Sequence, residues 1–324
     1  MDSTSNTIST HVPVYFSVVI PCWNSASTLP AALDSLMAQD FANWEAFIID
    51  DGSTDNTPDI IEEYCARDYR FRTLKTIRSG PSNARNMAGL NHAKSNFIAF
   101  LDSDDLWAPQ KLSKVFQCAN QNQEADAFYS RIAFFSSSEK IIETVSTVYK
   151  NALKPYDLLR DNPVCTLSNL VIKTSVFEQH RGFDPFIIHN EDVEFLVRVA
   201  AAGSVIAGID ETLVYYRTST SGLSSNLASM RAGWHKALTT LQNLGTPLSP
   251  QQLAAADAGN LRYLARRALR TGAPGFEALK LALNGVCRSP RSFFNPFWRG
   301  GMTFGGAIIA PFLPQSIRKL AFSR

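Results

Sequence analysis

The first hundred residues alternate short hydrophobic runs with segments of helical spacing, and this alternation limits the folds open to the chain. The runs lie at residues 16–20, 46–49 and 97–101, with a weaker one at 71–77, and Pro21 is expected to end the first. Continuously apolar strands separated by helical segments are typical of a parallel sheet covered on both faces. We therefore expect an α/β fold whose ligands bind at the carboxyl ends of the strands.

Three carboxylates, those of Asp102, Asp104 and Asp105, directly follow the run at 97–101. Close negative charges repel one another unless a cation or hydrogen-bond donors compensate them. Mg²⁺ or Mn²⁺ suits oxygen ligands and often takes one or two carboxylates together with substrate phosphates. The cluster therefore favours a metal site, and the alternative is that Asp105 only starts the next helix.

A second polar cluster, which includes Asp50 and Asp51, follows the run at 46–49. Its carboxylates can accept hydrogen bonds from a base or a ribose, and the alternative is a turn that serves only the loop. Arg85 lies near the start of the helix expected at 82–93, where its guanidinium could bind phosphate oxygens, although arginines are also common on surfaces.

A third acidic segment, residues 189–194, opens a helix expected at 191–202. Asp192 shares its helical face with the apolar residues three, four and seven positions later, so it should point inward. Glu191 shares a face with Glu194 and Arg198, which have i,i+4 ion-pair spacing, so these acids should be solvated. The helix dipole favours an ionised carboxylate at this end, which suits a proton acceptor; the alternative is an ordinary first-turn acid.

The chain changes character after residue 125. Longer strands are expected at 126–135 and 141–149, a last strand at 212–216, and helices at 227–243, 250–271 and 275–287. A serine-rich turn after residue 217 is the clearest boundary. We expect a flexible N-terminus at 1–13, a catalytic domain at 14–218 and a helical region with a basic, aromatic tail at 219–324.

The formal charge of the 324-residue chain is only +2, which gives no reason to expect nucleic acid as a partner. Seven of the 31 basic residues and none of the 29 acidic ones lie from Lys280 onward, so an acidic body is followed by a basic tail. The five cysteines show no zinc or disulfide spacing. Without a signal-like N-terminus or an apolar stretch of about 20 residues, a cytoplasmic protein is expected.

The basic tail is also aromatic: it contains Phe293, Phe294, Phe297, Trp298 and Phe304. Aromatic residues favour the headgroup region of a bilayer, and cations are attracted to anionic lipids. The tail is therefore expected to lie on the cytoplasmic face of the inner membrane, and the alternative is that its aromatic residues pack back onto the body.

Five segments in order resemble the motifs of family-2 glycosyltransferases with the GT-A fold. They are SVVIPCWNSASTL, IIDDGSTDNT, GPSNARN, FIAFLDSDDLW and HNEDVEF, and the resemblance covers residues 14–217. It implies a GT-A fold with a mostly parallel central sheet and an inverting transfer of sugar from a nucleotide-diphosphate sugar, with a UDP-sugar favoured. The family's processive members carry a Q-x-x-R-W motif and membrane spans that this sequence lacks, so a single transfer per encounter is expected.

The resemblance also implies a role for each matching residue. Asp192 is the expected catalytic base, and Asp105, with Asp104, is expected to bind Mg²⁺ or Mn²⁺. His189, Glu191 and Trp107 are possible acceptor contacts. The nucleotide sugar is expected to contact Pro21, Cys22, Trp23, Asn24, Asp51, Arg85 and Asp104.

The acceptor is expected to be a saccharide or a lipid-linked saccharide, as in the assembly of a bacterial surface polysaccharide. Two other readings stay open. One is a nucleotidyltransferase, which would normally have a glycine-rich basic loop after its first strand; the other is a degenerate transferase that only binds nucleotide sugars.

Overall fold

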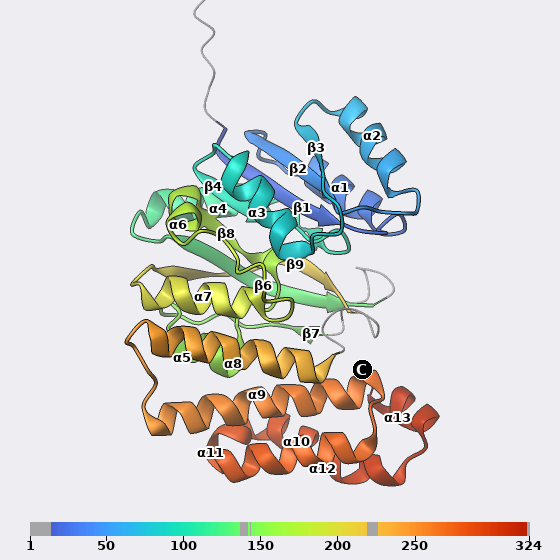
Figure 1. Cartoon of the computed structure of the whole chain (residues 1–324), viewed down its shortest axis with the longest axis vertical. Helices are drawn as coiled ribbons and strands as arrows, with labels where there is room; N and C mark the ends of the chain where they lie inside the picture. Colours follow the sequence, from blue (N-terminus) through green and yellow to red (C-terminus); the bar gives the residue numbers. More distant parts are fainter. Residues whose placement is uncertain (1–13, 137–141, 143, 219–225, 323–324) are drawn as a thin grey trace, which may run out of the picture.

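The computed structural model describes residues 14–136, 142, 144–218 and 226–322. It contains a nine-stranded mixed sheet with helices on both faces and a helical layer below it (Figure 1). The N-terminus expected to be flexible, residues 1–13, and most of the serine-rich boundary, residues 219–225, lie outside the described part.

One half of the sheet is parallel, as the hydrophobic runs predicted. β1 (Phe16–Cys22) lies between β2 (Trp44–Asp50) and β4 (Phe97–Phe100), and β3 (Phe71–Lys75) forms the edge beyond β2. All three pairings are parallel. The strand ends after β2 and β4 are therefore on one edge, where the two acidic clusters follow them.

Pro21 does not end β1, which continues to Cys22. The Leu101 N–H donates to the Val19 carbonyl, so Val19 faces β4 with its polar backbone groups. Alternate residues of a strand face the same neighbour, so the N–H that Pro21 lacks would point toward β4, whose pairing stops at Val19 and Phe100. The proline therefore fits within the strand without loss of a sheet hydrogen bond.

The other half of the sheet is mixed and was predicted less well. β8 (Val171–Lys173) lies antiparallel between β4 and β6 (Ala127–Phe135), and β9 (Ile206–Arg217) lies parallel to β6. β5 (Leu106–Trp107) pairs with β9, and β7 (Thr144–Val145) pairs with β6. β9 is much longer than the strand expected at 212–216, because its pairing with β6 continues across an irregularity at Arg131.

Two sets of helices cover the two faces of the sheet. Val18 and Ile20 of β1 pack on one side and Val19 on the other, each in its own hydrophobic cluster. The first side is covered by α1 (Leu29–Met37), α2 (Thr57–Arg67) and α4 (Lys111–Gln121). The second side is covered by α3 (Pro81–Asn91), α5 (Pro155–Asp161), α6 (Thr174–Gln179), α7 (Glu191–Ala201) and α8 (Leu227–Asn243).

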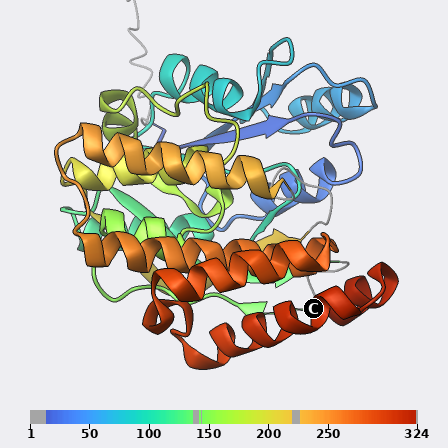
Figure 2. The same cartoon turned by 60° about the horizontal axis from the view of Figure 1, so that its bottom comes forward.

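α9 (Pro250–Thr271) separates the body from the remaining helices, as the two views show (Figures 1 and 2). It starts with a reciprocal cap: Ser249 accepts from the Gln252 N–H, and the Gln252 side chain accepts from the Ser249 N–H. Beyond it lie α10 (Gly275–Arg288), α11 (Pro290–Phe293), α12 (Phe297–Ile309) and α13 (Gln315–Phe322). The helices expected at 227–243, 250–271 and 275–287 are thus confirmed.

The boundary between body and helical region is not sharp. The Trp234 indole of α8 donates a 2.8 Å hydrogen bond to the Leu159 carbonyl of α5, and both residues belong to a core that includes α7. α9 to α13 share a separate cluster around Phe293 and Leu264. None of the described helices is long and apolar enough to cross a bilayer.

Candidate functional site

A cavity of about 460 Å³ lies between the carboxyl edge of the sheet and α9. Its upper wall comes from the segment after β4, the loop after α5 and the start of α7, and its lower wall from α9 and α12. Of the expected site residues, the cavity brings together Arg85, Asp104, His189, Glu191 and Asp192. It therefore joins three motifs that are far apart in the sequence.

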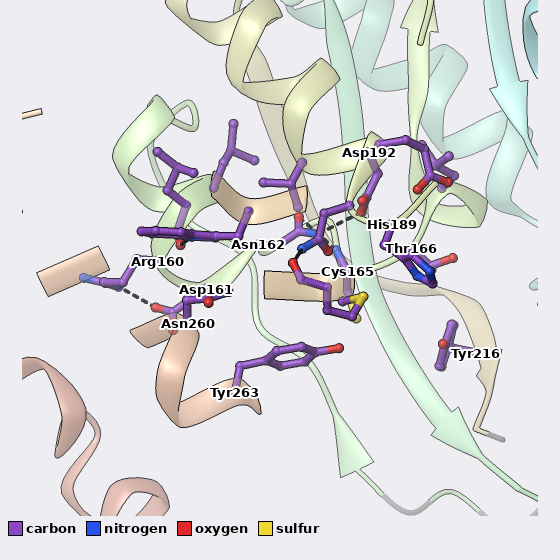
Figure 3. Close-up of a pocket in the computed structure, with 18 of the residues that line it drawn as sticks. Arg160, Asp161, Asn162, Cys165, Thr166, His189, Asp192, Tyr216, Asn260 and Tyr263 are labelled. Atoms are coloured by element: carbon purple, nitrogen blue, oxygen red, sulfur yellow. Dashed lines mark hydrogen bonds and ion pairs between the residues drawn. The ribbon is translucent and has the colours of Figure 1, made fainter. Parts of the chain in front are cut away.

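Asp192 lies at the mouth of α7 and faces this cavity (Figure 3). Asn190, two residues before Asp192, has a positive φ of 60°, which turns the chain sharply into the helix. Asn162 donates a 3.0 Å hydrogen bond from its amide Nδ2 to Asp192 Oδ2. Burial raises the pKa of Asp192, while the Asn162 hydrogen bond acts in the opposite direction. The group is thus a partly sheltered carboxylate with a fixed orientation, suited to accept a proton.

Glu191 is not solvated, contrary to the expectation from helical spacing. Arg85 donates from Nη1 to Glu191 Oε1 at 3.1 Å and from Nη2 to Asp102 Oδ1 at 2.6 Å. Burial raises the pKa of Glu191 to about 7, although the Arg85 charge opposes this rise. Arg85 itself is buried. Its guanidinium links the acids after β4 to the acids of α7 and so fixes the distance between the two motifs.

Glu194 was expected to be solvated and is buried instead. Its carboxylate pairs with Arg198 at 2.9 Å, as the i,i+4 spacing predicted, and accepts a 3.1 Å hydrogen bond from the Thr240 hydroxyl of α8. The prediction failed because α8 covers this side of α7, which the sequence of α7 alone does not reveal.

The acids after β4 have different surroundings. Asp102 and Asp104 line the cavity, whereas Asp105 is only 1% exposed and does not. Asp105 accepts hydrogen bonds from the Arg217 N–H at 2.9 Å and the Thr166 hydroxyl at 3.3 Å. Burial and the neighbouring acids hold its pKa well above the usual range. Its carboxyl therefore ties β9 to this loop, and the geometry favours Asp104 over Asp105 as a cation ligand.

Asp104 lines the cavity together with Asp102. Burial and the charge of Asp102 raise its pKa to about 6, the direction expected for clustered acids without a compensating cation. In the described part of the chain, no group of three or more candidate side chains could hold a metal ion. The Asp102 carboxylate accepts from Arg85 at 2.6 Å and from the Thr166 hydroxyl at 3.3 Å. Mg²⁺ or Mn²⁺ commonly takes only one or two carboxylates, with water or substrate phosphates in the remaining positions.

Asp51, expected to contact a base, uses its carboxylate within the protein. It accepts from the Thr76 hydroxyl, from both the N–H and the hydroxyl of Ser79, and from the Gly80 N–H, at 2.5–3.0 Å. Burial acts to raise the pKa of Asp51, but these hydrogen bonds outweigh it and the pKa is lowered. Asp51 thus orders the loop that leads into α3, and it is Asp50 that forms the turn of its own loop, by accepting a 3.0 Å hydrogen bond from the Ser53 N–H.

The residues after β1 lie beside this loop and outside the cavity. Trp23 is exposed, and the Arg78 guanidinium lies 3.8 Å from its ring centroid. Asn24 accepts a 2.8 Å hydrogen bond from the Thr54 N–H. Cys22 is buried beside Pro21, and its Sγ–H donates to the Ile49 carbonyl at 3.3 Å. The structure therefore groups these residues at one strand end, next to the Asp51 loop.

Trp107 is a correction to the expected acceptor contacts. It is 3% exposed, its indole donates to the Ser168 carbonyl at 2.8 Å, and it does not line the cavity. It belongs to the two-residue strand β5, which pairs with β9 and turns the side chain into the core.

The lower wall of the cavity is basic and was not predicted. Arg262, Tyr263 and Arg266 come from α9, and Arg299 comes from α12. Figure 3 shows Tyr263 reaching from α9 into the cavity that Asp192 faces. Burial and the charges of neighbouring arginines lower the pKa of Arg266 to about 10. The four-residue spacing of Arg262 and Arg266 was the available signal, because it places both on one face of a helix.

The tail aromatic residues divide into two sets. Phe293 is fully buried and Phe294 and Phe304 pack against the cluster shared by α9 and α10, as the alternative reading proposed. Phe297 and Trp298 of α12 are 78% and 66% exposed.

Comparison with known proteins gives one family. Residues 17–181 match the model described as "Glycosyl transferase family 2". The chain is 31% identical over 215 residues to the UDP-Glc:alpha-D-GlcNAc-diphosphoundecaprenol beta-1,3-glucosyltransferase WfgD of Escherichia coli, covering 65% of this chain and 79% of the relative. An uncharacterised glycosyltransferase of Rickettsia felis is also 31% identical, over 63% of this chain but only 33% of the relative's length.

Solved structures give the same fold. S. aureus TarS 1–349 in complex with UDP-GlcNAc matches with a TM-score of 0.55 at 18% identity, over 95% of this chain and 89% of TarS. The mannosyltransferase PcManGT from Pyrobaculum calidifontis, in complex with GDP-Man and Mn²⁺, matches with a TM-score of 0.60 at 18% identity, over 96% of this chain and 88% of that one.

Proposed function

Because the chain belongs to glycosyltransferase family 2 and has the GT-A fold, we propose that it is an inverting, non-processive transferase that uses a UDP-sugar. The acceptor is a saccharide or a lipid-linked saccharide. The observation that carries this proposal is the cavity itself, where Asp192 at the mouth of α7 and the acids after β4 share one wall.

Asp192 is the general base of this proposal. Its carboxylate accepts the proton of the acceptor hydroxyl while that oxygen attacks the anomeric carbon from the face opposite the leaving diphosphate, which inverts the configuration there. Asn162 keeps the carboxylate oriented through the 3.0 Å hydrogen bond. Arg85 acts as a positioning residue, because it joins Glu191 beside the base to Asp102 on the donor side.

Asp104, with Asp102, would hold Mg²⁺ or Mn²⁺. A divalent ion bound there neutralises charge on the departing nucleoside diphosphate. Support comes from the position of Asp102 and Asp104 on the cavity wall and from the Mn²⁺ named with GDP-Man in the PcManGT structure. Asp105, which the resemblance implied as a metal ligand, is proposed instead to support the loop through its contacts with Thr166 and Arg217.

The proposed donor site lies along β1 and the Asp51 loop, with Pro21, Cys22, Trp23 and Asn24 beside it. A uridine nucleotide is favoured because WfgD is named for UDP-Glc and TarS is bound to UDP or UDP-GlcNAc. Exposed Trp23, stacked on Arg78, offers a flat surface at the edge of this region.

A panel of nucleotide sugars tests the proposal. We expect the purified protein to bind and slowly hydrolyse UDP-Glc or UDP-GlcNAc when Mn²⁺ is present, and activity with GDP-Man alone would contradict the choice of a UDP-sugar. Binding without hydrolysis or transfer would identify a degenerate binding module. Release of pyrophosphate from a nucleoside triphosphate would instead indicate a nucleotidyltransferase.

We also propose that α12 contacts the cytoplasmic face of the inner membrane. Trp298 and Met302 are four residues apart on this helix and are 66% and 65% exposed, with Phe297 beside them. Removal of the tail would also remove the buried Phe293 and uncover the apolar residues of α9 that share its cluster, so a point variant is the better test. Trp298→Ser with Met302→Ser should reduce sedimentation with anionic liposomes, whereas equal pelleting of variant and wild type would contradict the contact.

A further inference from the structure

Two arginines on the lower wall of the cavity lack a carboxylate partner among the residues that the structure describes. Arg266 of α9 and Arg299 of α12 line the cavity, and across residues 14–136, 144–218 and 226–322 no acid forms an ion pair with either. The neighbouring arginines differ, because Arg160 and Arg262 both pair with Asp161, at 2.7 and 3.0 Å. Positive charge at this wall is therefore compensated in part only.

The charge is partly sheltered. Arg266 is half-buried, whereas Arg299 is exposed, and the charges of Arg270, Arg299 and Arg262 act on Arg266 in the same unfavourable direction as burial. Like charges in a sheltered site repel more strongly than in bulk water, so an anion that enters the cavity is attracted to them. Arg262 is held in place by hydrogen bonds to the Phe293 and Ser292 carbonyls, which fixes α9 against the segment before α12.

The opposite wall of the same cavity is acidic, with Asp192, Glu191 and Asp104. A ligand with one anionic end and one neutral, hydroxyl-bearing end therefore has a preferred orientation here. Its anionic end lies at the arginines, and its hydroxyl lies at Asp192. Tyr263 reaches from α9 into the cavity in Figure 3, where its ring can pack against a sugar between the two ends.

We propose that Arg266 and Arg299 form a subsite for a phosphate or diphosphate ester on the acceptor. The inference rests on the proposed function, because it takes the reacting hydroxyl to be at Asp192. The ester carries a lipid: Arg299 is followed in α12 by the exposed Met302 and preceded by the exposed Trp298, so a hydrocarbon chain can leave the cavity along an apolar surface.

Binding of geranyl diphosphate in EDTA tests the subsite without catalysis, because EDTA removes the metal contribution of Asp102 and Asp104. Saturating UDP is added in a second arm to occupy the donor site. We expect Arg266→Gln and Arg299→Gln each to weaken binding about tenfold, the effect of losing a hydrogen bond to a charged group. Arg291→Gln, an exposed residue of α11 outside the cavity, serves as the matched control and should bind as wild type does.

Three results would overturn the proposal: no binding by wild type, equal binding by all variants, or complete displacement by UDP, which would assign the arginines to the donor. Inorganic pyrophosphate distinguishes the sources, since equal affinity for it would show a site for free diphosphate and contradict the lipid ester. Failure of the proposed function gives a different result, because wild type would then bind no nucleotide sugar with Mn²⁺.

Two further measurements on Arg266 exclude a loss of binding through misfolding. Arg266→Gln should unfold at no lower temperature than wild type, because the change removes repulsion between arginines. Arg266→Lys should bind geranyl diphosphate more tightly than Arg266→Gln.

Discussion

The two walls of the cavity differ in charge, in origin and in how they are held. The upper wall is acidic and comes from the ends of sheet elements, and Arg85 joins its carboxylates across two motifs. The lower wall is basic and comes from α9 and α12, where Arg266 and Arg299 remain without acidic partners among the described residues. On the acidic wall Arg85 compensates Asp102 and Glu191, whereas on the basic wall Arg266 and Arg299 leave positive charge for a ligand.

This difference separates the residues proposed for the transfer reaction from those proposed to bind the acceptor. The motifs of the body bring together the groups that a sugar transfer needs, and the helical region adds groups that no transfer step requires. Close contact joins the two parts: a Cβ on Gly259 of α9 would lie 2.5 Å from the Arg160 carbonyl of α5. Substitutions in either wall can therefore test how the two walls depend on each other.

The largest effect is expected on the acidic wall. Asp192→Asn should lower turnover at least ~100-fold, the low end for loss of a general base, while donor affinity stays within about threefold. Steady-state kinetics and donor titration measure the two quantities. Asp210→Asn, an exposed change on β9, is the control. Turnover within a few-fold of wild type would remove Asp192 from the mechanism and direct attention to Glu191.

Gly259→Ala should weaken the packing of α9 of the lower wall against α5 of the upper wall. The new methyl meets the Arg160 carbonyl oxygen at 2.5 Å as well as the Arg160 Cγ at 2.8 Å, so α9 must shift and the free energy of unfolding should fall by about 1–3 kcal/mol. Gly301→Ala in α12 is the control, since no atom lies within 4 Å of its added Cβ and alanine favours a helix by up to about 1 kcal/mol. Urea unfolding compares them, and equal midpoints would show that the contact between α5 and α9 carries no stability.

A comparison of Asp104 and Asp105 sharpens the description of the acidic wall. Asp104→Asn should weaken Mn²⁺ binding in the presence of UDP about tenfold, because it removes a charged ligand. Asp105→Asn should weaken it less and instead change the temperature of unfolding, since its contacts are with Thr166 and Arg217. Calorimetric titration measures the affinities. A larger loss with Asp105→Asn would restore it as the metal ligand.

The smallest effect concerns the pH dependence of turnover. Asp192 must be deprotonated to accept a proton, and its pKa is raised, so turnover should increase with pH through that pKa. Asn162→Gly removes a hydrogen bond that favours the charged form, and glycine tolerates the φ of 38° found there. The acid limb should move to higher pH, with turnover on that limb reduced roughly threefold, as for loss of a weak hydrogen bond. A shift to lower pH would contradict this.

Sequence patterns predicted the parts of the site that follow strong local signals. Asp104 and Asp192 stand next to buried elements, and their motifs have fixed order. Glu194 was placed in solvent because its exposure depends on α8, and Trp107 was assigned to the acceptor because a two-residue strand has no periodicity. The parallel half of the sheet was predicted from continuous apolar runs, but β8, only three residues long, was missed.

The Asp51 carboxylate has a consequence for how fast a nucleotide could be captured. Its four hydrogen bonds order the loop at residues 76–80 in the free protein, before any ligand arrives. The loop therefore loses its conformational entropy when the protein folds, and not when a ligand binds. A donor that meets a preformed loop needs no slow rearrangement there, so its encounter rate should be governed by diffusion and orientation.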